Sequence, residues 1–330
     1  MPLDRRSFLL QSGSIALPGA LFSATAISAE NAWPQARPIR VVIPYAAGGV
    51  TDSVGRKLIE QMSKVLGQSM VVENKGGAGG TVGMLEVAKA RPDGYTLALS
   101  AISPLTLSPH LNKLGYDANK DIVAVAPMMY SPVYVLATSA FNGSTWEDLI
   151  AQARAKPDTV RFATSGMGSV GHIMLEQIQV RTGARFIHVP YKGVGQTITD
   201  AVGGQFEVMT GNPFGTINTL IEQGKLRVLA TTGPQRAPNQ PAVATLAEKG
   251  VPEANLTSLF GFMAPAGTPS QIINRLNEVV QEQVATEAIR DTLRATDNVG
   301  LRQSAAEFAA LLKQESRNNA EIIKKANITA

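Results

Sequence analysis

The chain has 330 residues, of which 44% are hydrophobic, and a formal net charge of +4. This length and composition suit one large or two medium-sized α/β domains, each with its own core, and two domains are the better expectation. Basic and acidic residues are well mixed, and no basic block with interleaved aromatics occurs, so we expect no nucleic-acid partner. Cysteine is absent, and the three histidines lack a paired metal-ligand spacing. We therefore expect no disulfide, no metal and no cofactor.

The N-terminus has the pattern of an export signal. Arg5 and Arg6 precede Phe8 and a mildly apolar segment, and small residues follow as far as Ala29. Glycine, serine and proline interrupt that segment too often for a stable membrane-spanning helix. Residues 1–29 therefore predict a twin-arginine signal and a periplasmic location for the mature chain.

The first strand–helix unit covers residues 39–66. A β-branched run at 39–43 predicts a strand buried on both faces of a parallel sheet. Apolar residues then recur at helical spacing as far as Leu66, and Thr51 or Asp52 is expected to cap this helix.

The turn between this strand and helix contains Gly48 and Gly49. Glycine lets backbone N–H groups approach a ligand, and the helix dipole adds positive potential. Together they predict an anion site without a cationic side chain. An ordinary strand-to-helix turn is the alternative.

The same arrangement recurs at residues 160–181. A short β run at 160–164 leads into the Gly/Ser loop 165–171, and a helix is expected from His172 to about Arg181. Two such loops predict two half-sites that face each other across a cleft and hold one small anionic solute.

Strands and helices alternate in both halves of the chain, which is typical of α/β sheets. Ser100 and Ser103 follow the expected strand 95–99, at the strand end where ligands bind in such folds, although solvated loop serines are the alternative. The last third is predicted to be helical and to pack back on the first lobe. We therefore expect one lobe from residues 30–130 and 255–330, another from 131–254, and closure about a hinge.

Two motifs in this sequence resemble enzyme signatures. Residues 166–171 match the dinucleotide motif G-x-G-x-x-G, but no carboxylate follows near position 190 to bind the ribose of NAD. Lys192 lies there instead and would suit a 2′-phosphate, so only NADP stays open. Ser169 lacks the glycine two positions earlier that a nucleophile elbow requires, and His172 and His188 are more typical of structural hydrogen bonding. We therefore expect no enzyme.

The chain resembles the extracytoplasmic solute receptors of the tripartite tricarboxylate transporter family, the Bug proteins. The resemblance rests on five blocks in register: residues 38–52, 71–80, 90–97, 188–193 and 263–269. It implies a two-lobed periplasmic binding fold, each lobe a mostly parallel sheet flanked by helices, with a carboxylate held between loops 45–52, 164–172 and 191–193, partly through water. The candidate ligand-binding residues are Tyr45, Ala47, Gly48, Gly49, Thr51, Asp52, Ser100, Ser103, Thr164, Ser165, Gly168, Ser169, His172, Tyr191, Lys192 and Asn212.

The expected function is that of a monomeric receptor that delivers an organic carboxylate to membrane transporter subunits. Mono-, di- and tricarboxylates, aromatic acids included, all remain open. Departures from the family pattern at Ala46, Ala47 and Val50 alter the first loop, and those at 210–212 and 259–260 predict room for a bulkier or less cationic ligand. An exported enzyme acting on small carboxylic acids and a ligand sensor for a signalling partner are the alternatives.

Overall fold

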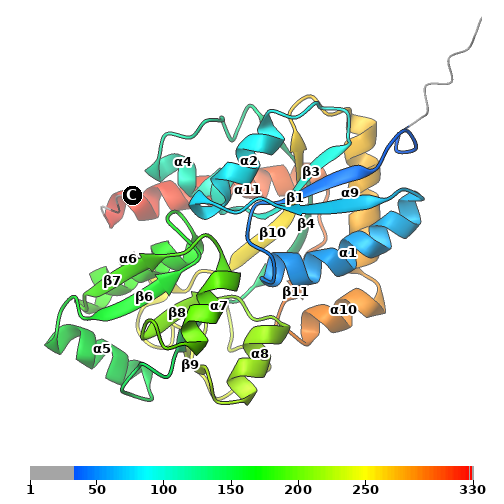
Figure 1. The fold of residues 1–330 in the computed structure, drawn as a ribbon. Helices are drawn as coiled ribbons and strands as arrows, with labels where there is room; N and C mark the ends of the chain where they lie inside the picture. The colour runs from blue at the N-terminus through cyan, green and yellow to red at the C-terminus, as the bar shows by residue number, and fades with distance from the viewer. Residues whose placement is uncertain (1–32, 327, 329–330) are drawn as a thin grey trace, which may run out of the picture.

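The computed structural model describes residues 33–326 and residue 328. The predicted export signal at residues 1–29 lies outside this range and stays a prediction. Within the range, no helix is long and apolar enough to cross a membrane. Figure 1 shows two sheets side by side, each flanked by helices, which confirms the expected two-lobed α/β fold.

The first sheet has six strands in the order β11-β4-β10-β3-β1-β2. β1 (Ile39–Ile43) pairs in parallel with β2 (Met70–Asn74) and β3 (Thr96–Ala101), as the alternation predicted. β10 (Ser258–Pro265) is antiparallel to both β3 and β4 (Ile122–Ser131), and β11 (Val299–Gly300) pairs with β4. The sheet is therefore mixed rather than mostly parallel, because β10 returns from the other lobe between β3 and β4.

Helices cover both faces of the first sheet, as the β-branched strand β1 requires. Val41 packs in one core with α1 (Val50–Leu66), α9 (Ser270–Val284) and α10 (Glu287–Arg294). Its neighbour Val42 packs on the opposite face with α2 (Thr81–Ala88) and with Phe308 of α11 (Ala305–Lys325). Successive side chains of a strand point to opposite faces, so an uninterrupted apolar run serves two layers.

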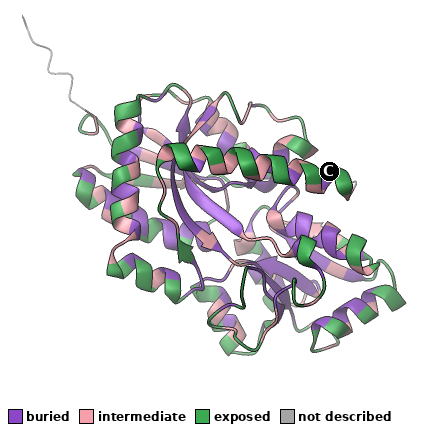
Figure 2. Cartoon of the chain, turned by 180° about the vertical axis from the view of Figure 1, so that it is seen from behind, coloured by how far each residue is buried: buried purple, intermediate pink, exposed green. Residues whose placement is uncertain are grey.

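The second sheet has the order β7-β6-β8-β5-β9 and is also mixed. Helices α5 and α6 share one core with it, and α7 and α8 pack on the other face. Figure 2 shows the buried strands enclosed by helices whose outer faces are exposed. The bounds are β5 Tyr134–Ala137, α5 Trp146–Ala155, β6 Val160–Thr164, α6 Val170–Thr182, β7 Phe186–Pro190, α7 Val194–Val202, β8 Val208–Gly211, α8 Gly215–Glu222 and β9 Arg227–Ala230.

The chain passes from the first sheet to the second between β4 and β5, and it returns between β9 and β10. The C-terminal helices α9 and α11 then contact β4 of the first sheet. Short helical segments complete the fold: η1 Ala78–Gly80, α3 Ser103–Thr106, α4 Ser108–Leu111 and η2 Pro252–Ala254.

Candidate functional site

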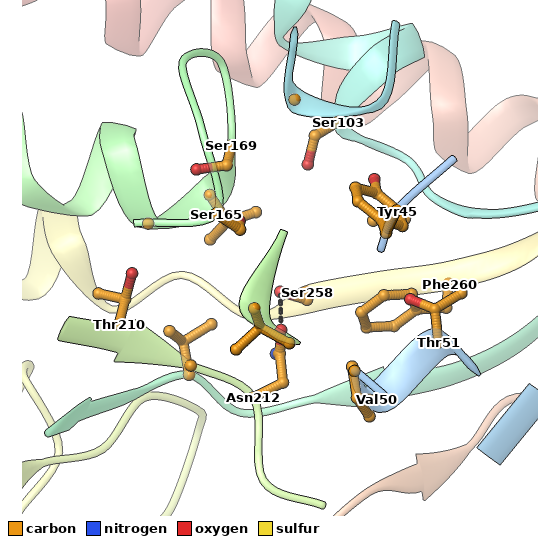
Figure 3. Close-up of a pocket in the computed structure, with 18 of the residues that line it drawn as sticks. Tyr45, Val50, Thr51, Ser103, Ser165, Ser169, Thr210, Asn212, Ser258 and Phe260 are labelled. Carbon is orange, nitrogen blue, oxygen red and sulfur yellow. Dashed lines mark hydrogen bonds between the residues drawn. The ribbon is translucent and has the colours of Figure 1, made fainter. Parts of the chain in front are cut away.

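A cavity lies where loops of the two sheets meet, and we call it the cleft cavity. Its empty volume is about 720 Å³, open mouth included. Figure 3 shows Tyr45, Thr51 and Ser103 on one side of this space and Ser165 and Ser169 on another. The full lining is Tyr45, Ala46, Gly49, Val50, Thr51, Asp52, Gly79, Ala101, Ser103, Val133, Ser165, Ser169, Val170, Gly171, Val194, Thr210, Gly211, Asn212, Ser258 and Phe260.

The N-terminus of α1 reaches this cavity. Its N-cap is Gly49, whose extended backbone starts the helix, and no side chain caps it. The expected cap at Thr51 or Asp52 is therefore wrong: Asp52 is the third residue of the helix, and its Oδ2 accepts the Gly48 N–H at 3.1 Å. Because the first amides of a helix have no acceptor within it, Val50 and Thr51 present N–H groups that a bound anion can use.

Asp52 is held by several donors at once. Arg56 Nε donates to Oδ1 at 2.9 Å, and Asn74 Nδ2 donates to the same oxygen at 3.0 Å. Asn74 Nδ2 also donates to the Tyr45 carbonyl at 3.1 Å, so the turn before α1 is fastened to β2. Through these bonds Asp52 stabilises the turn, and its carboxylate is already hydrogen-bonded within the protein.

The N-terminus of α6 reaches the same cavity from the second sheet. This helix begins at Val170, two residues before the predicted start, because the Ser169 side chain caps it by accepting the His172 N–H at 3.2 Å. The Gly168 N–H donates to His172 Nδ1 at 3.3 Å, so it is already used. Val170 and Gly171 both line the cavity, and their amides, in the first turn, have no acceptor within the helix.

Two stacked histidines lie beneath this loop. The rings of His172 and His188 are 4.7 Å apart and nearly parallel, and His188 Nε2 lies 2.7 Å from Thr164 Oγ1. Burial lowers the pKa of His172, and burial together with the charge of His172 lowers the pKa of His188 to about 4. Both rings are therefore neutral at pH 7, which suits Nδ1 of His172 as an acceptor.

Eight of the sixteen candidate residues line the cleft cavity: Tyr45, Gly49, Thr51, Asp52, Ser103, Ser165, Ser169 and Asn212. Burial raises the pKa of Tyr45 to about 12, so its hydroxyl stays protonated, 3.4 Å from Ser100 Oγ. The other eight are not part of the lining: Ala47, Gly48, Ser100, Thr164, Gly168, His172, Tyr191 and Lys192. Of these, Tyr191 donates its hydroxyl to Asp200 at 2.7 Å.

Several residues of the lining are not among the predicted ligand contacts. Ser258 and Phe260 come from β10, which the chain enters only after crossing back from the second sheet. Ser258 Oγ donates to Asn212 Oδ1 at 3.4 Å, the dashed line in Figure 3. Val133 and Val194 add apolar surface. No local motif marks these positions, although the departure noted at Phe260 fell on one of them.

Among the described residues that line the cleft cavity, Asp52 is the only charged one. A bound carboxylate would therefore be stabilised by hydrogen bonds from hydroxyls and from peptide N–H groups at two helix N-termini, where the dipoles favour an anion. No lysine, arginine or histidine of the described chain lines this cavity.

The two lobes touch around the cavity mouth through glycines. A Cβ on Gly79 would lie 2.3 Å from the Met167 carbonyl oxygen, and one on Gly195 would lie 2.6 Å from the carbonyl oxygen of Ala47. Contacts this short leave no space for a methyl group, so backbone of one lobe packs directly on backbone of the other. The structure therefore has the lobes together.

The model of the family described as "Tripartite tricarboxylate transporter family receptor" matches residues 54–328. Protein BugT of Bordetella pertussis (strain Tohama I) is 37% identical over 262 residues, which cover 79% of this chain and 80% of that protein.

Two solved structures carry bound ligands. Rpa4515 of R. palustris with adipate has a TM-score of 0.85 and 29% identity, with 90% of this chain and 99% of that chain covered. MatC of Rhodopseudomonas palustris with bound malate has a TM-score of 0.82 and 29% identity, with 88% and 99% covered. Both ligands are dicarboxylates.

Proposed function

This chain belongs to the receptors of the tripartite tricarboxylate transporter family, and we propose that it captures an organic carboxylate in the periplasm and delivers it to membrane transporter subunits. The observation that carries the proposal is the meeting of two helix N-termini, from α1 and α6, in one cavity whose described lining residues include no cationic side chain. The similarity to proteins whose structures hold adipate and malate supports a carboxylate as the ligand class.

The cavity also restricts the body of the ligand. Val50, Val133, Val194 and Phe260 give it apolar walls, so a hydrocarbon or aromatic body gains from burial. The only carboxylate in the described lining, Asp52, already accepts from Gly48, Arg56 and Asn74. An ammonium group would find no free acidic partner, so the ligand is a mono-, di- or tricarboxylate without an amino group.

We also propose the bounds of the lobes, the ligand contacts, the export route and the monomeric state. The lobes comprise residues 30–130 with 255–330 and residues 131–254, and they close on the ligand about the two crossings. The candidates that line the cavity contact the ligand. The protein is exported by the twin-arginine route and works as a monomer.

A thermal-shift screen followed by calorimetry tests the ligand class. The panel contains mono-, di- and tricarboxylates, aromatic acids, and amino acids such as aspartate as matched controls. We expect a carboxylate without an amino group to raise Tm, because a ligand that binds only the folded state stabilises it. A preference for aspartate over its amino-free analogue succinate would refute the proposed ligand class.

A turnover assay on the stabilising compound tests the receptor role itself. We expect the compound to be recovered unchanged after long incubation with the protein. Steady product formation would refute the receptor and favour an exported enzyme. Capture of a signalling protein, with no transporter-dependent uptake of the compound in cells, would favour a sensor.

A further inference from the structure

A second cavity lies on the other side of the hinge. Along the first crossing, Pro132 lines this second cavity and its neighbour Val133 lines the cleft cavity. On the return crossing, Thr257 and Ser258 divide in the same way. The two crossings therefore form a partition with one cavity on each side. We call the second one the hinge cavity; its empty volume is about 1310 Å³, open mouth included.

Both lobes contribute to the hinge cavity. The segment 232–238, after β9, supplies one wall, and the end of α9, α10 and β11 supply the other. Figure 1 shows α10 and β11 close to the second lobe. Asn218 of α8 donates to the Ala295 carbonyl at 3.1 Å, just after α10, so this wall is joined directly to the other lobe.

The hinge cavity is strongly basic. Four arginines line it: Arg236 from the second lobe, and Arg290, Arg294 and Arg302 from the C-terminal segment. Arg236 binds both carboxylate oxygens of Glu248 and donates to the Pro241 carbonyl at 3.2 Å, so only part of its guanidinium remains for an anion. Arg294 pairs with Asp291 on the surface, where a single pair contributes little. Within the described chain, Arg290 and Arg302 have no ion pair.

The one carboxylate in this lining does not offset that charge locally. Asp297 is 5% exposed, and its Oδ1 accepts the Asn239 N–H at 2.9 Å. Its Oδ2 accepts the Tyr134 hydroxyl. Both oxygens thus already accept hydrogen bonds from the second lobe, whereas four arginines line the same cavity.

From this arrangement we propose that the hinge cavity is a second ligand site, for a multivalent anion held by Arg290 and Arg302 together with Arg236. Guanidinium groups suit phosphate and carboxylate oxygens because they present several donors in a fixed plane. A single anion that contacts arginines of both lobes stabilises the arrangement in which the lobes are together. If the protein is the receptor proposed above, the second anion then favours the closed form and raises affinity in the cleft.

Pyrophosphate is the probe, because it is multivalent and lacks a carboxylate. Calorimetry with the wild-type chain is compared with the double variant Arg290→Gln/Arg302→Gln. The matched control is Lys57→Gln/Arg91→Gln, which removes two positive charges from exposed positions outside both cavities. We expect saturable binding that weakens at least tenfold in the first variant and less than twofold in the control. Equal weakening in both, or no saturable binding by wild type below about 10 mM, would overturn the site.

Hydrogen exchange gives the location independently of affinity. Pyrophosphate should slow exchange in 232–238 and 285–302. Protection confined to 45–52 and 165–171 would instead place the anion in the cleft and refute the hinge cavity.

Coupling between the two cavities is tested with the carboxylate from the screen, whose affinity should rise about fivefold with saturating pyrophosphate. An unchanged affinity would refute the coupling. If the screen yields no carboxylate, the receptor proposal fails while the pyrophosphate measurements still decide the second site.

Discussion

Substituting Gly195 by alanine should hold the lobes apart without damaging either one. Gly195 lies in the first turn of α7 and has no positive φ, so alanine is free of backbone strain there. Its Cβ, however, would lie 2.6 Å from the carbonyl oxygen of Ala47 in the other lobe. Ordinary contacts begin at 3.4 Å, so the two backbones must part by about 0.8 Å (3.4 − 2.6).

The cost falls on the closed form alone, because Ala47 belongs to the opposite lobe. One extra methyl group in a packed contact costs about 1–3 kcal/mol. Since each 1.4 kcal/mol is a factor of ten in an equilibrium constant, ligand affinity should fall about 5- to 150-fold. Calorimetry with the carboxylate from the screen measures this loss, and small-angle scattering should show a ligand-bound variant that stays more extended than wild type.

Gly215→Ala is the matched control. It also changes a glycine in the first turn of a helix, α8, but a Cβ there meets nothing within 4 Å. Affinity should stay within about twofold of wild type, and both variants should keep the wild-type Tm without ligand or rise slightly, as glycine-to-alanine changes in helices do. If Gly195→Ala binds as tightly as Gly215→Ala, the contact between lobes does not limit closure and the reasoning is refuted.

Three further predictions concern Ser169, His188 and Lys192. Ser169→Ala should lower stability by about 1 kcal/mol, seen as a lower Tm, because the cap on the His172 amide is lost; an unchanged Tm would contradict this. As pH falls from 6.5 towards 4, Tm should decrease, because the folded pKa of His188 is depressed to about 4 and the unfolded chain binds the proton first; His188→Gln should flatten this decrease, and an equally steep profile would exclude His188 as its source. Lys192→Ala should leave carboxylate affinity within about twofold, since Lys192 does not line the cleft cavity, and a tenfold loss would place it in the site.

Local patterns predicted much of the fold. The run 39–43 forms β1 with the predicted bounds, and the helix after it ends at Leu66, as predicted, with Gly67 in the left-handed conformation. Two segments of the last third, 268–271 (T-x-x-Q) and 304–307 (S-x-x-E), have the sequence pattern of a capping box. The box forms at Ser304 but not at Thr268, because α9 begins after Pro269 and the Thr268 hydroxyl donates to the Pro265 carbonyl. Side-chain hydrogen bonds near a helix start have several local solutions, and tertiary packing selects among them.

The sequence also predicted only part of the candidate site. Glycines at 48–49 and 166–171 marked both loops correctly as cavity neighbours, because glycine has a specific backbone use. Which amides remain available was not readable from the sequence. Gly48 and Gly168 donate to Asp52 and His172, and the lining residues that offer helix amides come two and three residues later.

By itself, the sequence determined the two strand–loop–helix units, the lack of any thiol chemistry and the family, because each depends on residue type and local spacing. Only the tertiary structure decided that Phe260 and Ser258 line the cleft cavity and that arginines of both lobes line one second cavity. The second cavity brings together residues more than fifty positions apart in the chain, for example Arg236 and Arg290. Their proximity results from how the chain crosses twice between sheets, and that information is not contained in any local pattern.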